Sequence, residues 1–125
     1  MKDDGHGRPR VGTSGRDLGA RIGSGDHCDI PCSNDGLVAP DTGGMSVYIH
    51  DFEEMPYHRK PRWLGGSSND TLWRLDFVSV PSTLKIARPD ITSHAFVEPG
   101  AVMEGDVYLA TLASTATEWE PLYAW

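Results

Sequence analysis

Residues 40–44, Pro-Asp-Thr-Gly-Gly, form the first stretch of the chain whose residue types could do chemistry. We call this stretch the glycine loop. Paired glycines let successive backbone N–H groups turn toward an anion, and Thr42 adds a hydroxyl beside Gly43 and Gly44. The same composition is typical of an ordinary tight turn. The loop therefore predicts either a phosphate-binding backbone or a turn, and the residues around it must decide.

The segment that follows the glycine loop has the alternation of a half-buried strand. Over residues 44–50, one side would carry Met45, Val47 and Ile49, and the other side would carry Ser46, Tyr48 and His50. Ser46 and Tyr48 would then place a hydroxyl and an aromatic ring next to the loop. This polar face either lines a cleft or simply faces solvent.

A second chemical stretch is residues 93–98, in which His94, Phe96 and Glu98 would share one face of a strand. Each step of two residues advances by about 6.6 Å, which separates His94 from Glu98 by about 13 Å. That distance excludes a hydrogen-bonded dyad, but it suits contact with the two ends of one extended ligand. Ordinary surface or core roles are the alternative for a single histidine and a single glutamate.

Other segments must position these side chains, and two more strands are predicted. Segment 71–78 alternates polar residues with three large apolar ones, Trp73, Leu75 and Phe77, and segment 83–87 is a shorter strand. The links between the predicted strands are too short for crossover connections, so mainly antiparallel pairing is expected.

From residue 101 the pattern becomes helical, with Met103, Val107 and Ala110 at spacings of four and three and with Tyr108 and Leu112 beside them. Acidic residues near its start suit the positive end of a helix dipole. Strands followed by a C-terminal helix predict the α+β class.

The chain divides by composition into two parts. Residues 1–33 carry seven glycines in their first 25 positions, whereas all four tryptophans and all three phenylalanines lie in residues 34–125. A glycine-rich polar segment buries too little surface to offset its ordering entropy. We therefore expect a disordered or loosely packed segment 1–33 and a folded domain 34–125.

Charge and hydropathy restrict the function classes. The net charge is −7 and no lysine or arginine follows Arg88, which argues against nucleic-acid binding because few cations are present to neutralise phosphates. The basic cluster 59–62 is either a solvated loop or a contact for a pyrophosphate. No run approaches the roughly 20 apolar residues of a membrane span, and no apolar stretch follows the first residues as in a signal peptide. These features predict a cytoplasmic protein without a membrane partner.

The two cysteines, Cys28 and Cys32, lie in a polar segment. A zinc site would require further Cys or His ligands at suitable spacing, and no second pair follows. Two reduced thiols and no metal are therefore expected, in keeping with a cytosolic protein.

Residues 35–47, Asp-Gly-Leu-Val-Ala-Pro-Asp-Thr-Gly-Gly-Met-Ser-Val, resemble the type VI secretion effector toxins of the ADP-ribosyltransferase-like superfamily and their fungal relatives. His94, in a strand that ends at a proline, and Met103, which opens a helix, extend the resemblance over about residues 34–119. Members usually have a longer amino-terminal region with an early Leu-Tyr-Arg strand, and nothing in this sequence matches it.

The resemblance implies a split, mainly antiparallel sheet, a cleft for NAD as substrate, and an NAD-dependent ADP-ribosyltransferase acting on a protein or other macromolecule. It implies delivery into a target cell and an immunity protein as a partner. Thr42 and Ser46 would contact NAD together with Gly43, Gly44 and Tyr48. For catalysis it points to His94, with Glu98 as the candidate glutamate. The alternatives are a truncated, inactive relative and a protein-interaction module whose anchors are Trp119, Tyr123 and Trp125.

Overall fold

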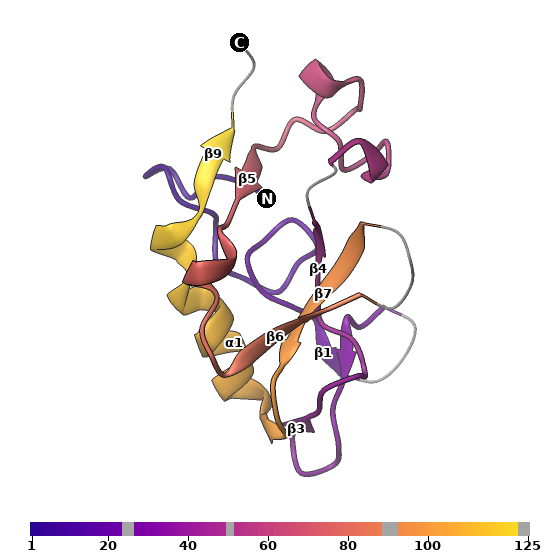
Figure 1. The fold of residues 1–125 in the computed structure, drawn as a ribbon, viewed down its shortest axis with the longest axis vertical. Coiled ribbons are helices and arrows are strands. Elements are labelled where there is room, and N and C mark those ends of the chain that lie inside the picture. The colour runs from indigo at the N-terminus through magenta and orange to yellow at the C-terminus, as the bar shows by residue number, and fades with distance from the viewer. Residues whose placement is uncertain (24–26, 50–51, 89–92, 123–125) are drawn as a thin grey trace.

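The computed structural model describes residues 1–23, 27–49, 52–88 and 93–122 (Figure 1). Its centre is an antiparallel sheet of three strands in the order β4 (Met45–Tyr48), β7 (His94–Pro99) and β6 (Leu84–Ala87). Figure 1 shows these strands crossing the middle of the molecule, with α1 (Gly105–Ser114) to one side. Strands with a single C-terminal helix confirm the predicted α+β class.

Three short strand pairs complete the sheet structure. β5 (Leu72–Arg74) pairs with β9 (Glu120–Leu122), and β3 (Leu37–Val38) pairs with β8 (Met103–Glu104), both antiparallel. β1 (Ile22–Gly23) and β2 (Ile30–Pro31) form a parallel pair. The pairing is therefore mainly antiparallel, as expected. The 3₁₀ turns are η1 (Phe52–Glu54), η2 (Arg62–Leu64), η3 (Phe77–Ser79) and η4 (Ala116–Glu118).

The register of the central sheet separates a core face from a polar face. Met45 lies opposite Val97, and Val97 lies opposite Ile86, so these apolar side chains share the face that joins the core. The core cluster also contains Tyr108 and Leu112 of α1. The alternation read from residues 45–48 and 94–98 is thus confirmed. His50 lies outside the described residues.

The predicted strand 71–78 is shorter than expected. β5 ends at Arg74, and η3 begins at Phe77, whose side chain is 55 % exposed. Trp73 is buried as predicted, whereas the prediction that Phe77 joins it on the core face is wrong. Alternation alone does not reveal where a strand loses its partner, and here β9 pairs only with residues 72–74.

The helix is present, but its buried face includes only part of the predicted apolar set. Gly105, Tyr108 and Leu112 face the core, whereas Val107 and Ala110 are exposed. The prediction counted its period from Met103, which belongs to β8 and not to α1. A phase taken from a residue outside the helix wrongly adds Val107 and Ala110 to the buried stripe, whereas Tyr108 and Leu112 of the predicted set do face the core. Within the described ranges, no helix has both the length and the apolar character that crossing a bilayer requires.

The structure places part of segment 1–33 in the core, which differs from the expectation of a loosely packed segment. Leu18, Ala20 and Ile30 are fully buried members of the main cluster. The Arg16 guanidinium also pairs with the Asp70 carboxylate at 2.5 Å and 2.7 Å. A few well-placed apolar residues are enough to dock a glycine-rich segment onto a larger core. The domain boundary at residue 34 stays a prediction.

The side chain of Tyr108 joins the helix to two strands of the central sheet. It is fully buried, its hydroxyl donates to the carbonyl oxygen of Val97 at 2.5 Å, and the backbone N–H of Met45 donates to that hydroxyl at 3.2 Å. Burial raises the pKa of Tyr108 to about 12. One hydroxyl therefore satisfies a buried acceptor and a buried donor on neighbouring strands.

Replacing Tyr108 by Phe should lower the free energy of unfolding by about 2 to 4 kcal/mol, because both the Val97 carbonyl and the Met45 N–H lose their partner in the interior. Urea unfolding followed by tryptophan fluorescence measures the loss. Tyr57→Phe is the matched control, since Tyr57 is 69 % exposed. Equal urea midpoints for the two variants would show that the Tyr108 hydroxyl does not stabilise the fold.

The raised pKa of Tyr108 also predicts a loss of stability in alkali. A tyrosine in the unfolded chain deprotonates near pH 10, whereas Tyr108 in the fold deprotonates near pH 12, so the unfolded state holds fewer protons between these values. Stability from this group is complete below pH 10 and falls by about 1.4 kcal/mol per pH unit above it. The difference between the parent and Tyr108→Phe in urea titrations isolates this slope, because all other groups titrate in both proteins. A difference that stays constant from pH 9 to 12 would contradict the prediction.

Candidate functional site

The polar face of the central sheet collects the chemical side chains that the sequence placed on separate strands. Cross-strand register puts Ser46 opposite Phe96 and Tyr48 opposite His94, and it puts Lys85 opposite Glu98. Residues directly opposite on antiparallel strands point to the same side of the sheet. The two chemical stretches of the sequence therefore form one continuous surface, which we call the polar face.

Three rings run along this surface from β4 to β7. The Tyr48 and His94 ring centroids lie 5.3 Å apart, and the His94 and Phe96 rings meet edge to face at 4.9 Å. Partial burial raises the pKa of Tyr48, with a smaller opposing effect from the charge of Arg59. The rings present a partly apolar strip on which a planar group can stack.

A pocket of about 400 Å³ lies at the Glu98 end of this strip. Its wall is built by residues from four parts of the chain: Asp29, Asp41, Thr42, Gly43, Ala87, Arg88, Phe96 and Glu98. Glu98 is only 2 % exposed. Its Oε1 accepts the backbone N–H of Asp41 at 3.0 Å and lies 3.4 Å from Nζ of Lys85. A carboxylate is thus held at the pocket wall with two partners on one oxygen.

Two N–H groups of the glycine loop, and that of Met45 which follows it, bond within the protein. The N–H groups of Asp41, Gly44 and Met45 donate to Glu98, to the Asp29 carbonyl and to the Tyr108 hydroxyl, respectively. The Thr42 hydroxyl donates to the carbonyl oxygen of Ala39 at 2.7 Å and retains acceptor capacity.

Close backbone approach explains the two glycines of the loop. Both have positive φ, and a Cβ on Gly43 or Gly44 would come closer than 3.0 Å to the carbonyl oxygens of Asp29 and Val97, respectively. The geometry therefore gives Gly43 and Gly44 a structural reason to be glycine. Their contact with NAD stays a prediction.

Sequence reasoning did not single out Asp29, Lys85 or Arg88 as residues of this site. Asp29 lies in the segment that was expected to be loose, and its carboxylate pairs with Arg21 at 3.1 Å. Lys85 alternates with Leu84 and Ile86, which signals its outward direction. Its position opposite Glu98 depends on a register that one sequence does not reveal.

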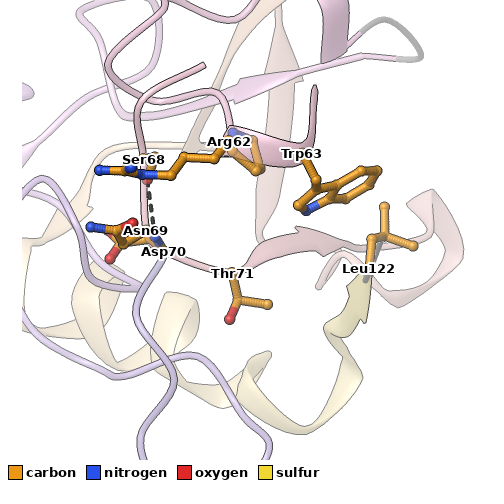
Figure 2. A pocket seen from close by; sticks show the side chains of 8 residues that line it. Arg62, Trp63, Ser68, Asn69, Asp70, Thr71 and Leu122 are labelled. Carbon is orange, nitrogen blue, oxygen red and sulfur yellow. Dashed lines mark hydrogen bonds between the residues drawn. The ribbon is translucent and has the colours of Figure 1, made fainter. Parts of the chain in front are cut away.

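A second pocket, of about 290 Å³, lies between the η2 region and β9 (Figure 2). Figure 2 shows Trp63 and Leu122 along one side of it, with Arg62, Asn69 and Asp70 on the other. The side-chain hydrogen bond from Arg16 lowers the pKa of Asp70. No residue lines both pockets.

The basic cluster 59–62 does not act as one unit. Arg62 lines the second pocket, Arg59 donates to the Gly15 carbonyl, and Lys60 donates to the Glu53 carbonyl at 2.7 Å. Its predicted contact with a pyrophosphate stays untested.

Cys28 and Cys32 are both partly buried. Within residues 1–23, 27–49, 52–88 and 93–122, no three His, Cys, Asp or Glu side chains are grouped to hold a metal ion. Comparison with models of known protein families gave no match, and comparison with curated proteins gave none.

The crowding at Gly44 generates a prediction about stability. Gly44→Ala should lower the free energy of unfolding by about 1 to 3 kcal/mol or more, because the added Cβ meets the Val97 carbonyl on a positive-φ backbone. Gly23→Ala is the control, since no atom of the described residues lies within 4 Å of a Cβ built there. Urea midpoints compare the two variants. If Gly44→Ala is as stable as Gly23→Ala, the inferred close approach of Gly44 to the Val97 carbonyl is wrong.

Proposed function

We propose that this chain is an ADP-ribosyltransferase-like toxin domain that binds NAD and transfers ADP-ribose to a macromolecular target. The observation that carries the proposal is the Glu98 carboxylate, held in a pocket wall at the end of the aromatic strip on the polar face. NAD is an extended ligand with planar groups and a reactive ribose. A carboxylate at one end of a row of rings suits that shape.

The chemistry needs a carboxylate next to the ribose. The bond between C1′ and the nicotinamide nitrogen breaks, and its electron pair leaves with nicotinamide. Positive charge develops on the ribose, and a fixed carboxylate stabilises that charge electrostatically. A nucleophile of the target then forms the new bond to C1′ and loses its proton. Glu98 has this role in the proposal.

Other residues of the polar face would bind and orient the ligand. Ser46 is exposed and lies opposite Phe96, so its hydroxyl can reach a ribose or phosphate held beside the rings. Thr42 lines the pocket, and Tyr48 or Phe96 would stack on nicotinamide. His94 packs between these two rings and would support them. The proposal includes the split antiparallel sheet that the resemblance implies.

An inactive relative is the second candidate, and one observation favours it. The N–H groups of Asp41 and Gly44 in the loop, and that of Met45 beside it, are already bonded inside the protein, which leaves fewer backbone donors for an anion. The interaction-module alternative gains less support. Trp119 packs against the core, and its indole N–H donates to the Thr115 hydroxyl at 2.9 Å. Tyr123 and Trp125 lie outside the described residues.

Two substitutions separate binding from chemistry. Ser46→Ala should weaken NAD binding by about 0.5 to 1.5 kcal/mol, the net value of one hydrogen bond. Glu98→Gln should leave NAD affinity nearly intact and depress nicotinamide release, because the carboxylate acts on charge that develops only in the transition state. Calorimetry with NAD and chromatography of released nicotinamide give the two readouts.

Ser82→Ala is the control, since it removes an exposed hydroxyl outside the polar face. Absence of NAD binding by the parent chain at millimolar ligand would overturn the proposed function. It would leave the inactive relative as the better description.

A further inference from the structure

Lys85 connects the carboxylates of Asp41 and Glu98, two residues of the pocket wall. Its Nζ donates to Oδ1 of Asp41 at 2.9 Å and lies 3.4 Å from Oε1 of Glu98. The same Glu98 oxygen accepts the backbone N–H of Asp41. Lys85, Asp41 and Glu98 therefore form a closed set of three contacts, which we call the Lys85 clamp.

Burial shows which of these contacts matters most. The Asp41 side chain is 80 % exposed, and an ion pair made there contributes little in water. Glu98 is almost fully buried, and a buried carboxylate is costly unless it is paired and hydrogen-bonded. The cation of Lys85 is therefore worth more to Glu98 than to Asp41.

The clamp also restrains the glycine loop. Asp41 has φ of 65°, the left-handed region that non-glycine residues rarely adopt. Its amide is fixed to Glu98 and its carboxylate to Lys85, so both ends of this residue are tied to β7 and β6. Loss of the Lys85 cation frees the Asp41 carboxylate. The hydrogen bond between the Asp41 N–H and Glu98 then opens more easily.

We propose that Lys85 is a positioning residue of the site, which fixes the Glu98 carboxylate and the Asp41 backbone against each other at the pocket wall. Lys85 acts through Glu98 and does not need to touch the ligand. The catalytic part of this inference rests on the proposed function, whereas the clamp itself does not. The hydrogen bond to Asp41 raises the pKa of Lys85. Its ammonium is charged at neutral pH in any case.

The clamp is tested first without any ligand. Lys85→Met removes the charge and keeps much of the chain length, and Lys85→Arg keeps the charge. Amide hydrogen exchange of Asp41, followed by NMR, should be faster by about tenfold or more in Lys85→Met, because the opening of this hydrogen bond becomes easier. Lys85→Arg should stay near the parent. Arg74→Met is the matched control, since it breaks the exposed ion pair to Glu120.

The second readout is nicotinamide release from NAD. Lys85→Met should lower kcat by about tenfold or more with KM for NAD changed by less than about threefold, as expected when a reacting group is misplaced and ligand contacts remain. Lys85→Arg should restore most of kcat. In the Glu98→Gln background, Lys85→Met should have almost no further effect, because the residue on which it acts is already changed. Urea midpoints exclude loss of fold as the cause.

The outcomes are distinguishable. Unchanged exchange of the Asp41 amide in Lys85→Met overturns the clamp, whatever the activity. A raised KM with unchanged kcat overturns the positioning role and makes Lys85 a ligand contact. A parent chain that releases no nicotinamide defeats the proposed function, while the exchange measurement still decides whether the clamp exists.

Discussion

The Tyr108 hydroxyl sets the spacing on which the candidate site depends. It bonds to the Val97 carbonyl on β7 and to the Met45 N–H on β4, and these two residues are opposite each other in the sheet. The helix is thereby fixed to both strands at one point of the core. The same point leaves no space for a side chain at Gly44, since a Cβ there would meet the Val97 carbonyl and the Tyr108 hydroxyl. The position of the glycine loop and the packing of the core beneath it therefore depend on each other.

The bond between Tyr108 and Val97 also determines which side chains of β7 lie on the polar face of the sheet. Side chains alternate along a strand, so fixing Val97 toward the core directs Phe96 and Glu98 to the polar face. Residues from segment 1–33 complete the arrangement, because the Asp29 carbonyl accepts the Gly44 N–H and Asp29 lines the pocket. A segment with few apolar residues thus contributes both to the core, through Leu18 and Ile30, and to the site.

The sequence predicts local features of this protein well and nonlocal ones poorly. Alternation along residues 45–48 and 94–98 identifies the side chains of each face, because the period of a strand is a property of its own backbone. The pairing of Tyr48 with His94 joins residues far apart in the chain, and alternation does not encode that register. The expectation of a loosely packed segment 1–33 misses the burial of Leu18 for the same reason, since composition does not show where a single leucine packs. The prediction places Val107 and Ala110 on the buried face of the helix because it counts the period from Met103, which belongs to a strand.

Backbone bonding inside the glycine loop changes how ligand recognition should be understood in the proposed function. A phosphate nest needs several N–H groups directed at the anion, whereas here the N–H groups of Asp41, Gly44 and Met45 hold the loop to Glu98, Asp29 and Tyr108. These bonds hold the loop as part of the pocket wall. In the proposed function, side chains such as Thr42 and Ser46 add ligand contacts there. A site built in this way gains its precision from the packing beneath it, because a reacting group displaced by about 1 Å can lose about a hundredfold in rate.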